Sequence, residues 1–236
     1  MSELKDKCLT FQEYLNQIEK LKHSEGEILR EGFELLGLTF DVFNGNRKEL
    51  LASIKHFKSQ ESLLLFDVRN NKEMESLLKE TTRCLHNFLA SAKSLVDHTR
   101  VIVNRLYADH EFRNEYQSKL DQDLAKNPVQ KFVQNLRNYT QHYTLPILAL
   151  QITFSDDLNF NMKMDIEVLK QWDGWGSSKA YLEAIGDNFC IVTLANEYFV
   201  LIQGFYSWLI QRQQELHQAD FENLRKMEEE LRNIVM

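Results

Sequence analysis

Apolar side chains recur at three- and four-residue steps over most of this chain, which is the spacing of amphipathic helices. The N-terminal third predicts helices over Ser2 to Lys22, Ser24 to Leu36 and Arg47 to Lys58, with Asn44-Gly45-Asn46 as a turn before the last of them. The strongest periodicity runs from Asn71 to Tyr107. It predicts one long helix with a wide apolar stripe.

The next part of the chain predicts two shorter helices. Asp109 is expected to cap a helix that reaches Leu124. Asn127-Pro128 is typical of a helix start, because a proline at the first helical position loses no hydrogen bond that the helix needs. This second helix is expected to span Pro128 to Tyr143. It should stop before Pro146, since proline disfavours helical geometry in the residue ahead of it.

The pattern changes after Pro146. Two apolar-polar segments, Ile147 to Phe154 and Leu158 to Ile166, predict a β-hairpin at about 147–166. Helical signals then return. Trp172 to Gly176 is expected to form a turn, Ser177 and Ser178 to cap a short helix to about Ile185, Asp187 to cap a long apolar helix, and Asp220 to Ile234 to form the last helix.

Two prolines and eight glycines in 236 residues are too few for a fold of many short strands. The sequence therefore predicts a mainly α fold, a helical bundle with long antiparallel helices and one inserted β-hairpin. No repeat and no low-complexity linker divides it, so a single domain over residues 1–236 is expected.

The charge pattern limits how the chain could bind nucleic acid. Lys and Arg number 28 against 35 Asp and Glu, which gives a formal net charge of -7. This balance argues against a broad basic surface for DNA, because that mode of binding needs many cations that neutralise phosphates. Any contact with RNA is expected to be local.

Cysteine usage and hydropathy predict a cytoplasmic protein. Cys8, Cys84 and Cys190 lie far apart without a CxxC spacing, which favours a reducing compartment and neither a disulfide framework nor a zinc site. The N-terminus lacks the pattern of a secretory signal. The most apolar stretch, Ile191 to Ile210, carries Asn196, Glu197 and Gln203, so it predicts a buried helix and no membrane span.

One helix carries residues suited to chemistry. In the helix from Pro128, the residues Arg137, Asn138, Gln141 and His142 fall opposite the apolar face. At about 100° per residue, Arg137 and His142 lie about 140° apart with Asn138 between them. Arginine can stabilise charge on phosphate oxygens, and histidine can take a proton from a ribose 2′-hydroxyl or donate one to the leaving oxygen. The expected patch faces solvent and suits RNA cleavage without a metal.

The segment from Arg137 to His142 resembles the signature of the HEPN superfamily, whose ribonucleases carry an arginine, four to six residues, then a histidine. Asparagine, aspartate or histidine is favoured just after the arginine in that family. The resemblance implies a HEPN-like core over about residues 67–145, with Arg137 and His142 catalytic and Asn138 supporting them. It also implies a metal-independent endoribonuclease without a cofactor, formed where two copies meet in a homodimer. A toxin or defence effector of this kind would act on cellular RNA and be held by an inhibitory protein partner.

The spacing alone is weak, because Arg-x4-His also occurs at Arg105 to His110 and at Arg212 to His217. The copy at Arg137 differs by the asparagine that follows the arginine and by its clean apolar face. The alternative interpretation is a solvated helix face, with His142 as a cation at a helix C-terminus, in a non-catalytic helical interaction module.

Further candidates are secondary. Asp97 and His98, on the preceding long helix, are candidates for a supporting pair beside the Arg137 site, and Gln141 for a supporting amide. A helix-packing contact is the alternative for Asp97 and His98. The acidic residues Asp156, Asp157, Asp165 and Glu167 match no ligand pattern, so no metal site is expected.

Overall fold

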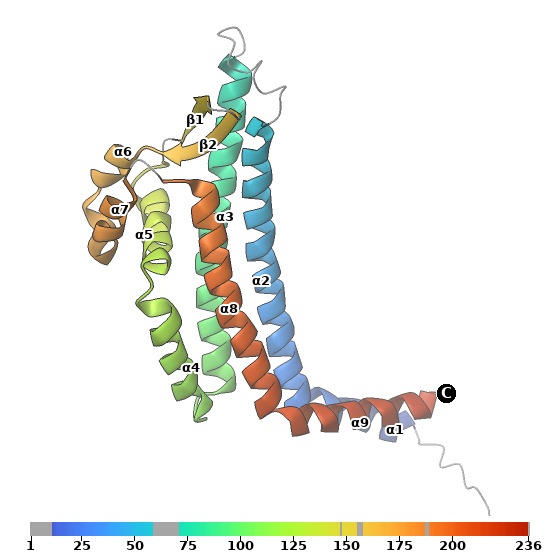
Figure 1. The fold of residues 1–236 in the computed structure, drawn as a ribbon. Coiled ribbons are helices and arrows are strands. Elements are labelled where there is room, and N and C mark those ends of the chain that lie inside the picture. The colour runs from blue at the N-terminus through green and yellow to red at the C-terminus, as the bar shows by residue number, and fades with distance from the viewer. Residues whose placement is uncertain (1–10, 59–70, 147, 155–157, 187–188, 236) are drawn as a thin grey trace, which may run out of the picture. The chain divides into compact units, whose positions relative to one another are not determined.

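A computed structural model describes residues 11–58, 71–146, 148–154, 158–186 and 189–235 (Figure 1). The predicted fold class, mainly α with one inserted hairpin, is confirmed. The helices are α1 (Phe11–Lys22), α2 (Glu25–Lys55), α3 (Asn71–Leu106), α4 (Phe112–Leu120), α5 (Pro128–His142), α6 (Ile166–Lys170), α7 (Lys179–Ile185), α8 (Ile191–Leu216) and α9 (Gln218–Val235). The strands are β1 (Leu148–Phe154) and β2 (Leu158–Met164).

The described chain divides into two compact units, one from the described parts of Met1–Gly37 and Ser207–Met236, the other from Leu38–Tyr206. In the first unit α1 packs on α9. The rings of Phe33 and Phe221 lie 5.6 Å apart, and Arg30 pairs with Glu228 at 2.5 Å. The expectation of a single domain stays a prediction.

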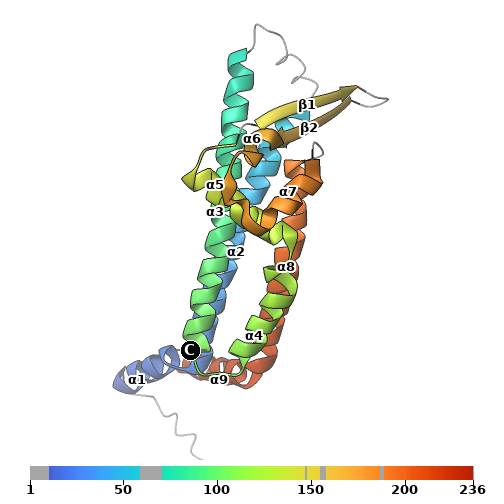
Figure 2. The ribbon, with the colours of Figure 1, turned by 90° about the vertical axis from the view of Figure 1, so that its left-hand side faces the viewer.

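Three long helices form the core of the Leu38–Tyr206 unit (Figures 1 and 2). Phe43 of α2, Phe88 of α3 and Tyr198 of α8 meet there, with ring centroids 5.6 to 6.1 Å apart. All three side chains are fully buried. Rings at these separations gain about 0.5–1.5 kcal/mol per pair beyond their buried area, so this cluster fixes the three helices against one another.

The turn predicted at Asn44-Gly45-Asn46 is wrong, because α2 runs unbroken through it. Buried Leu36, Phe43 and Leu50 recur every seven residues on one side of α2. Burying this stripe outweighs the cost of about 1 kcal/mol for a glycine inside a helix. Asn46 is accommodated because its amide nitrogen donates to the carbonyl of Val42 at 2.8 Å.

The predicted hairpin is confirmed, but its second strand ends at Met164 and not at Ile166, because Asp165 caps α6 and Ile166 begins that helix. The strands β1 and β2 pair antiparallel, with Leu148 opposite Met164 and Phe154 opposite Leu158. The residues Ile147 and 155–157 of the predicted hairpin lie outside the described residues.

Two predicted caps are replaced by other contacts. The ring nitrogen Nδ1 of His110, and not Asp109, accepts the backbone N–H of Phe112 at the start of α4, at 3.0 Å. Ser178 precedes α7 in helical geometry (φ -89°, ψ -4°) and makes no side-chain cap; its hydroxyl accepts instead from the amide of Asn135 at 2.9 Å. The predicted cap Asp187 lies outside the described residues.

In the described ranges, no helix has the length and apolar character that crossing a membrane requires. This holds for α8, whose middle contains Asn196, Glu197 and Gln203.

Candidate functional site

The helix α5, which carries Arg137 and His142, starts where the sequence predicts. The side chain of Asn127 accepts hydrogen bonds from the backbone N–H groups of Val129 and Gln130, at 2.9 and 3.3 Å, and Pro128 holds the first helical position. An asparagine cap satisfies backbone donors that would otherwise lack partners. The start of α5, and with it the register of Arg137, is therefore fixed locally.

Aromatic packing fixes the orientation of α5. Trp175, in the short helical turn Asp173–Ser178, stacks on Phe132 at 5.3 Å and on Tyr139 at 5.8 Å between centroids. The amide of Asn135 donates to the carbonyl of Trp175 at 2.7 Å. Burial raises the pKa of the Tyr139 phenol, and the neighbouring Tyr143 adds to the shift. One face of α5 is thus held against a rigid cluster, and Arg137, Asn138 and His142 lie outside it.

Arg137 is less exposed than the sequence predicts. Its side chain and that of Asn138 are half-buried, whereas Gln141 and His142 are exposed as predicted. Nη1 of Arg137 donates to Oδ1 of Asn138 at 3.2 Å. The Nε atom of Arg137 is buried without a hydrogen-bond partner, and no carboxylate of the described residues pairs with this guanidinium.

His142 is the last residue of α5, and its side chain is exposed. Within the described ranges it forms no hydrogen bond or ion pair, and none joins it to Arg137. Two exposed apolar side chains follow it in the chain: Tyr143 is 54% exposed and Leu145 is 53% exposed. The C-terminal end of α5 therefore presents a histidine beside a small apolar surface.

The other two Arg-x4-His copies have structural partners. His110 accepts the N–H of Phe112, as described above. His217 is buried, and its Nδ1 lies 3.0 Å from Oδ2 of Asp220. In the described part of the chain, His142 therefore differs from both by having its two ring nitrogens unengaged.

Asp97 and His98, the candidate supporting residues, both lie on α3. Asp97 has partners on α3 itself, and His98 has one on α2. Oδ1 of Asp97 accepts from Lys93 at 2.5 Å and from Arg100 at 3.3 Å, both on its own helix. Nδ1 of His98 lies 3.5 Å from the hydroxyl of Thr39 on α2. The contact of His98 matches the helix-packing alternative, whereas the contacts of Asp97 stay within α3. The role of both residues in a site stays a prediction.

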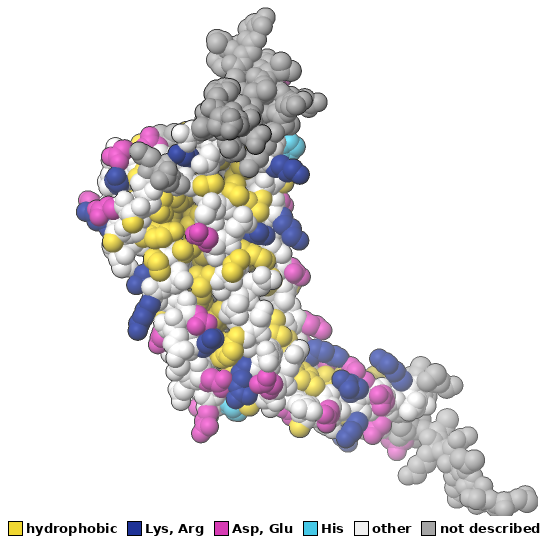
Figure 3. Space-filling model, in the orientation of Figure 1, with side chains coloured by type: hydrophobic (Ala, Val, Ile, Leu, Met, Phe, Trp, Pro, Cys, Tyr) yellow, Lys and Arg dark blue, Asp and Glu magenta, His cyan; other side chains and the backbone are white. Residues whose placement is uncertain are grey.

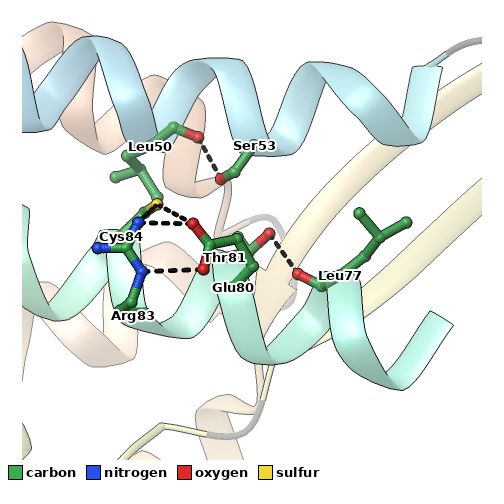
Figure 4. Close-up of polar contacts among 7 residues, drawn as sticks. All are labelled: Leu50, Ser53, Leu77, Glu80, Thr81, Arg83 and Cys84. Carbon is green, nitrogen blue, oxygen red and sulfur yellow. Dashed lines mark hydrogen bonds and ion pairs between the residues drawn. The ribbon is translucent and has the colours of Figure 1, made fainter. Parts of the chain in front are cut away.

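Sequence reasoning missed a polar group on the first half of α3 (Figure 4). Nε and Nη2 of Arg83 bind both carboxylate oxygens of Glu80, at 2.8 and 2.6 Å. The thiol of Cys84 lies 3.7 Å from Oε1 of Glu80, and burial raises the pKa of this thiol.

A cavity of about 640 Å³ lies along the same helix. One wall comes from α3, with Leu78, Thr82 and His86, and the opposite wall from Leu145 and Pro146, which follow α5. The steps of four residues between Leu78, Thr82 and His86 could have shown that these three share one helix face. The contribution of Leu145 and Pro146 could not have been found, because it depends on how the chain leaves α5.

Across the described ranges, no three His, Cys, Asp or Glu side chains gather as ligands for a metal ion. Comparisons with known proteins add no relationship: no protein-family model, no curated protein and no solved structure matches this chain.

Proposed function

We propose that this protein is a metal-independent endoribonuclease that uses Arg137, Asn138 and His142. One observation carries the proposal. The guanidinium of Arg137 is bound by the amide of Asn138 and by no described carboxylate. His142, an exposed histidine without a described partner, follows it by just over one turn of α5. The chain has seven more acidic than basic residues, yet Arg137 pairs with no described carboxylate. It is suited to an external anion, and phosphate is the anion that arginine binds in a fork geometry.

The chemistry follows from these three side chains. His142 takes the proton of a ribose 2′-hydroxyl, the resulting oxygen attacks the adjacent phosphorus, and the bond to the 5′-oxygen breaks. The leaving oxygen receives a proton from a second histidine or from water. The products are a 2′,3′-cyclic phosphate and a 5′-hydroxyl. Arg137 stabilises the charge on the phosphate oxygens, and Asn138 holds the guanidinium in place.

A second copy of the chain completes the site in this proposal. One chain supplies a single Arg137 and a single His142, whereas in-line attack needs both a proton acceptor and a proton donor. A two-fold axis beside α5 doubles each group. The exposed side chain of Tyr143 gives this end of α5 apolar surface that such an interface would bury. The resemblance to HEPN ribonucleases supports a role as a toxin or defence effector on cytoplasmic RNA, controlled by an inhibitory protein.

The test is RNA cleavage by the purified full chain and by Arg137→Ala and His142→Ala. Each substitution should abolish cleavage. For exposed His142 the free energy of unfolding should change by no more than about 0.5 kcal/mol. The matched controls are Arg105→Ala and His110→Ala, which have the same spacing and should retain cleavage. Cleavage that persists in both α5 variants would contradict the proposal.

The alternative, a non-catalytic interaction module, is favoured by a different surface. Figure 3 shows hydrophobic side chains gathered on one face of the Leu38–Tyr206 unit. Exposed apolar residues of this unit include Leu38 and Val42 on α2 and Val200 on α8. Val200 also lines a cavity of about 510 Å³ with Val129 of α5. Such a module predicts no cleavage by the wild-type protein and unchanged folding in Arg137→Ala.

A further inference from the structure

The cavity beside α3 has the size and lining of a small-molecule site. Its volume of about 640 Å³ lies within the 300–1,000 Å³ that is usual for ligand pockets. Aliphatic groups from Leu78, Leu145, Pro146 and Leu148 form its apolar surface. Pro146 and Leu148 are buried. A flat, largely uncharged group such as a nucleobase fits such walls better than an ion does.

Two polar side chains of the cavity, His86 and Thr82, can bind the edge of a nucleobase. Half-buried His86 forms no hydrogen bond or ion pair among the described residues, and its ring can donate or accept. The hydroxyl of Thr82 donates to the carbonyl of Leu78 at 2.8 Å and keeps its capacity to accept. Together they offer both kinds of hydrogen bond to a base edge.

Two cations lie at the mouth of the cavity and can reach a phosphate. Lys79 pairs with Glu75 at 2.7 Å and Arg83 pairs with Glu80, and all four side chains are at least half exposed. Exposed ion pairs of this kind contribute about 0–1 kcal/mol, so a phosphate oxygen can replace a carboxylate at little cost. The wall residues run from Glu75 to His86, and eleven steps of 1.5 Å along a helix give about 16 Å of length for a strand to follow.

The cavity is tied to the proposed ribonuclease site by the chain itself. Leu145 follows His142 by three residues, so their Cα atoms lie within about 11 Å of each other. We propose that this cavity binds a nucleobase of the RNA strand close to the cleaved phosphate and so sets the sequence preference of cleavage. The inference rests on the proposed ribonuclease function and names a base subsite for it.

The test fills the cavity from both walls. Leu78→Trp fills it from α3, and Leu145→Trp, at a more than half exposed position, fills it from the opposite wall. Val101→Trp is the matched control, because Val101 is 61% exposed on the same helix and does not line the cavity. Cleavage sites are mapped on RNA of random sequence. Binding of that RNA and of free nucleoside monophosphates is measured by fluorescence in the cleavage-deficient His142→Ala protein, with and without each tryptophan.

Wild type is expected to prefer certain bases at one position beside the cleaved bond. Either cavity variant should lose that preference and bind RNA about tenfold more weakly, a factor that corresponds to about 1.4 kcal/mol. Unchanged cleavage sites and unchanged RNA binding in both variants would overturn the subsite and leave the ribonuclease proposal standing. RNA binding that needs the cavity, without any cleavage by wild type, would overturn the ribonuclease proposal instead. Loss of free nucleotide binding alone would show that the occupant is not RNA.

Discussion

Oδ1 of Asn138 accepts a hydrogen bond from Nη1 of Arg137 at 3.2 Å. The guanidinium that would bind phosphate is therefore held by a neutral amide, which does not offset its positive charge. A carboxylate in this position would neutralise the guanidinium and repel phosphate. The pairing therefore serves to orient the guanidinium rather than to form an ion pair. Substitutions at Asn138 can therefore separate two properties of the Arg137 guanidinium, its orientation and the charge that surrounds it.

Replacing Asn138 should affect cleavage in two distinguishable ways. Asn138→Ala frees the guanidinium of Arg137 and should reduce kcat/KM by about 10- to 100-fold, because misplacing a catalytic group by about 1 Å can cost that much. Asn138→Asp adds a negative charge beside Arg137 and should reduce cleavage further. The control is Asn104→Ala, an exposed asparagine on α3. Equal activity of wild type and Asn138→Asp would show that Arg137 does not bind phosphate.

Cleavage is expected to persist in EDTA. In the proposed reaction Arg137 supplies the positive charge and His142 the proton transfer, so the described side chains account for both tasks. The products should carry 2′,3′-cyclic phosphate ends, which mass spectrometry of the RNA fragments detects. Activity that is lost on chelation and restored by magnesium, or products with 5′-phosphate ends, would point to another mechanism.

The long helices could be predicted because their apolar periodicity is local. The prediction for α3 ended at Tyr107, one residue beyond the observed end at Leu106, and that for α5 ended at Tyr143, one residue beyond His142. The turn at Asn44-Gly45-Asn46 failed because a local propensity competes with burial of a stripe whose partners lie on other helices.

The candidate site could be predicted only in part, for the same reason. The motif and the exposure of His142 follow from sequence and helical geometry. The burial of Arg137 depends on the elements that pack against α5, and no periodicity within α5 contains that information. The side-chain cap predicted for Ser178 is absent as well, and the recorded partner of its hydroxyl is Asn135, a residue 43 positions away that local sequence cannot indicate.

Alkaline unfolding should depend on Tyr116. Burial raises the pKa of this phenol from 10 to about 12. Its contribution to stability is therefore complete below pH 10 and is lost as the pH rises through 12, by at most about 2–3 kcal/mol for two units. Tyr116→Phe should lessen the fall in the free energy of unfolding between pH 10 and 12, as measured by urea denaturation. Tyr143→Phe, at a more than half exposed position, is the control and should leave the fall unchanged.

The last prediction is that the active species is a homodimer whose interface includes the end of α5. Light scattering at micromolar concentration should give twice the chain mass of 27.9 kDa. Tyr143→Glu places a charge on an apolar side chain that the interface would bury, so it should shift the protein to monomer and abolish cleavage without unfolding it. Val101→Glu, at an exposed position on α3, should stay dimeric and active.

Mixing two inactive variants tests whether one cleft is shared. A dimer of one Arg137→Ala chain and one His142→Ala chain retains one arginine and one histidine at the axis. With water as the proton donor to the leaving oxygen, the mixture should recover part of the wild-type rate, while each variant alone stays inactive. Two separate sites would each lack a residue in such a dimer and would recover nothing. Recovery therefore requires residues of both chains to act on one phosphate, and a fully active monomer with RNA bound would contradict the shared site.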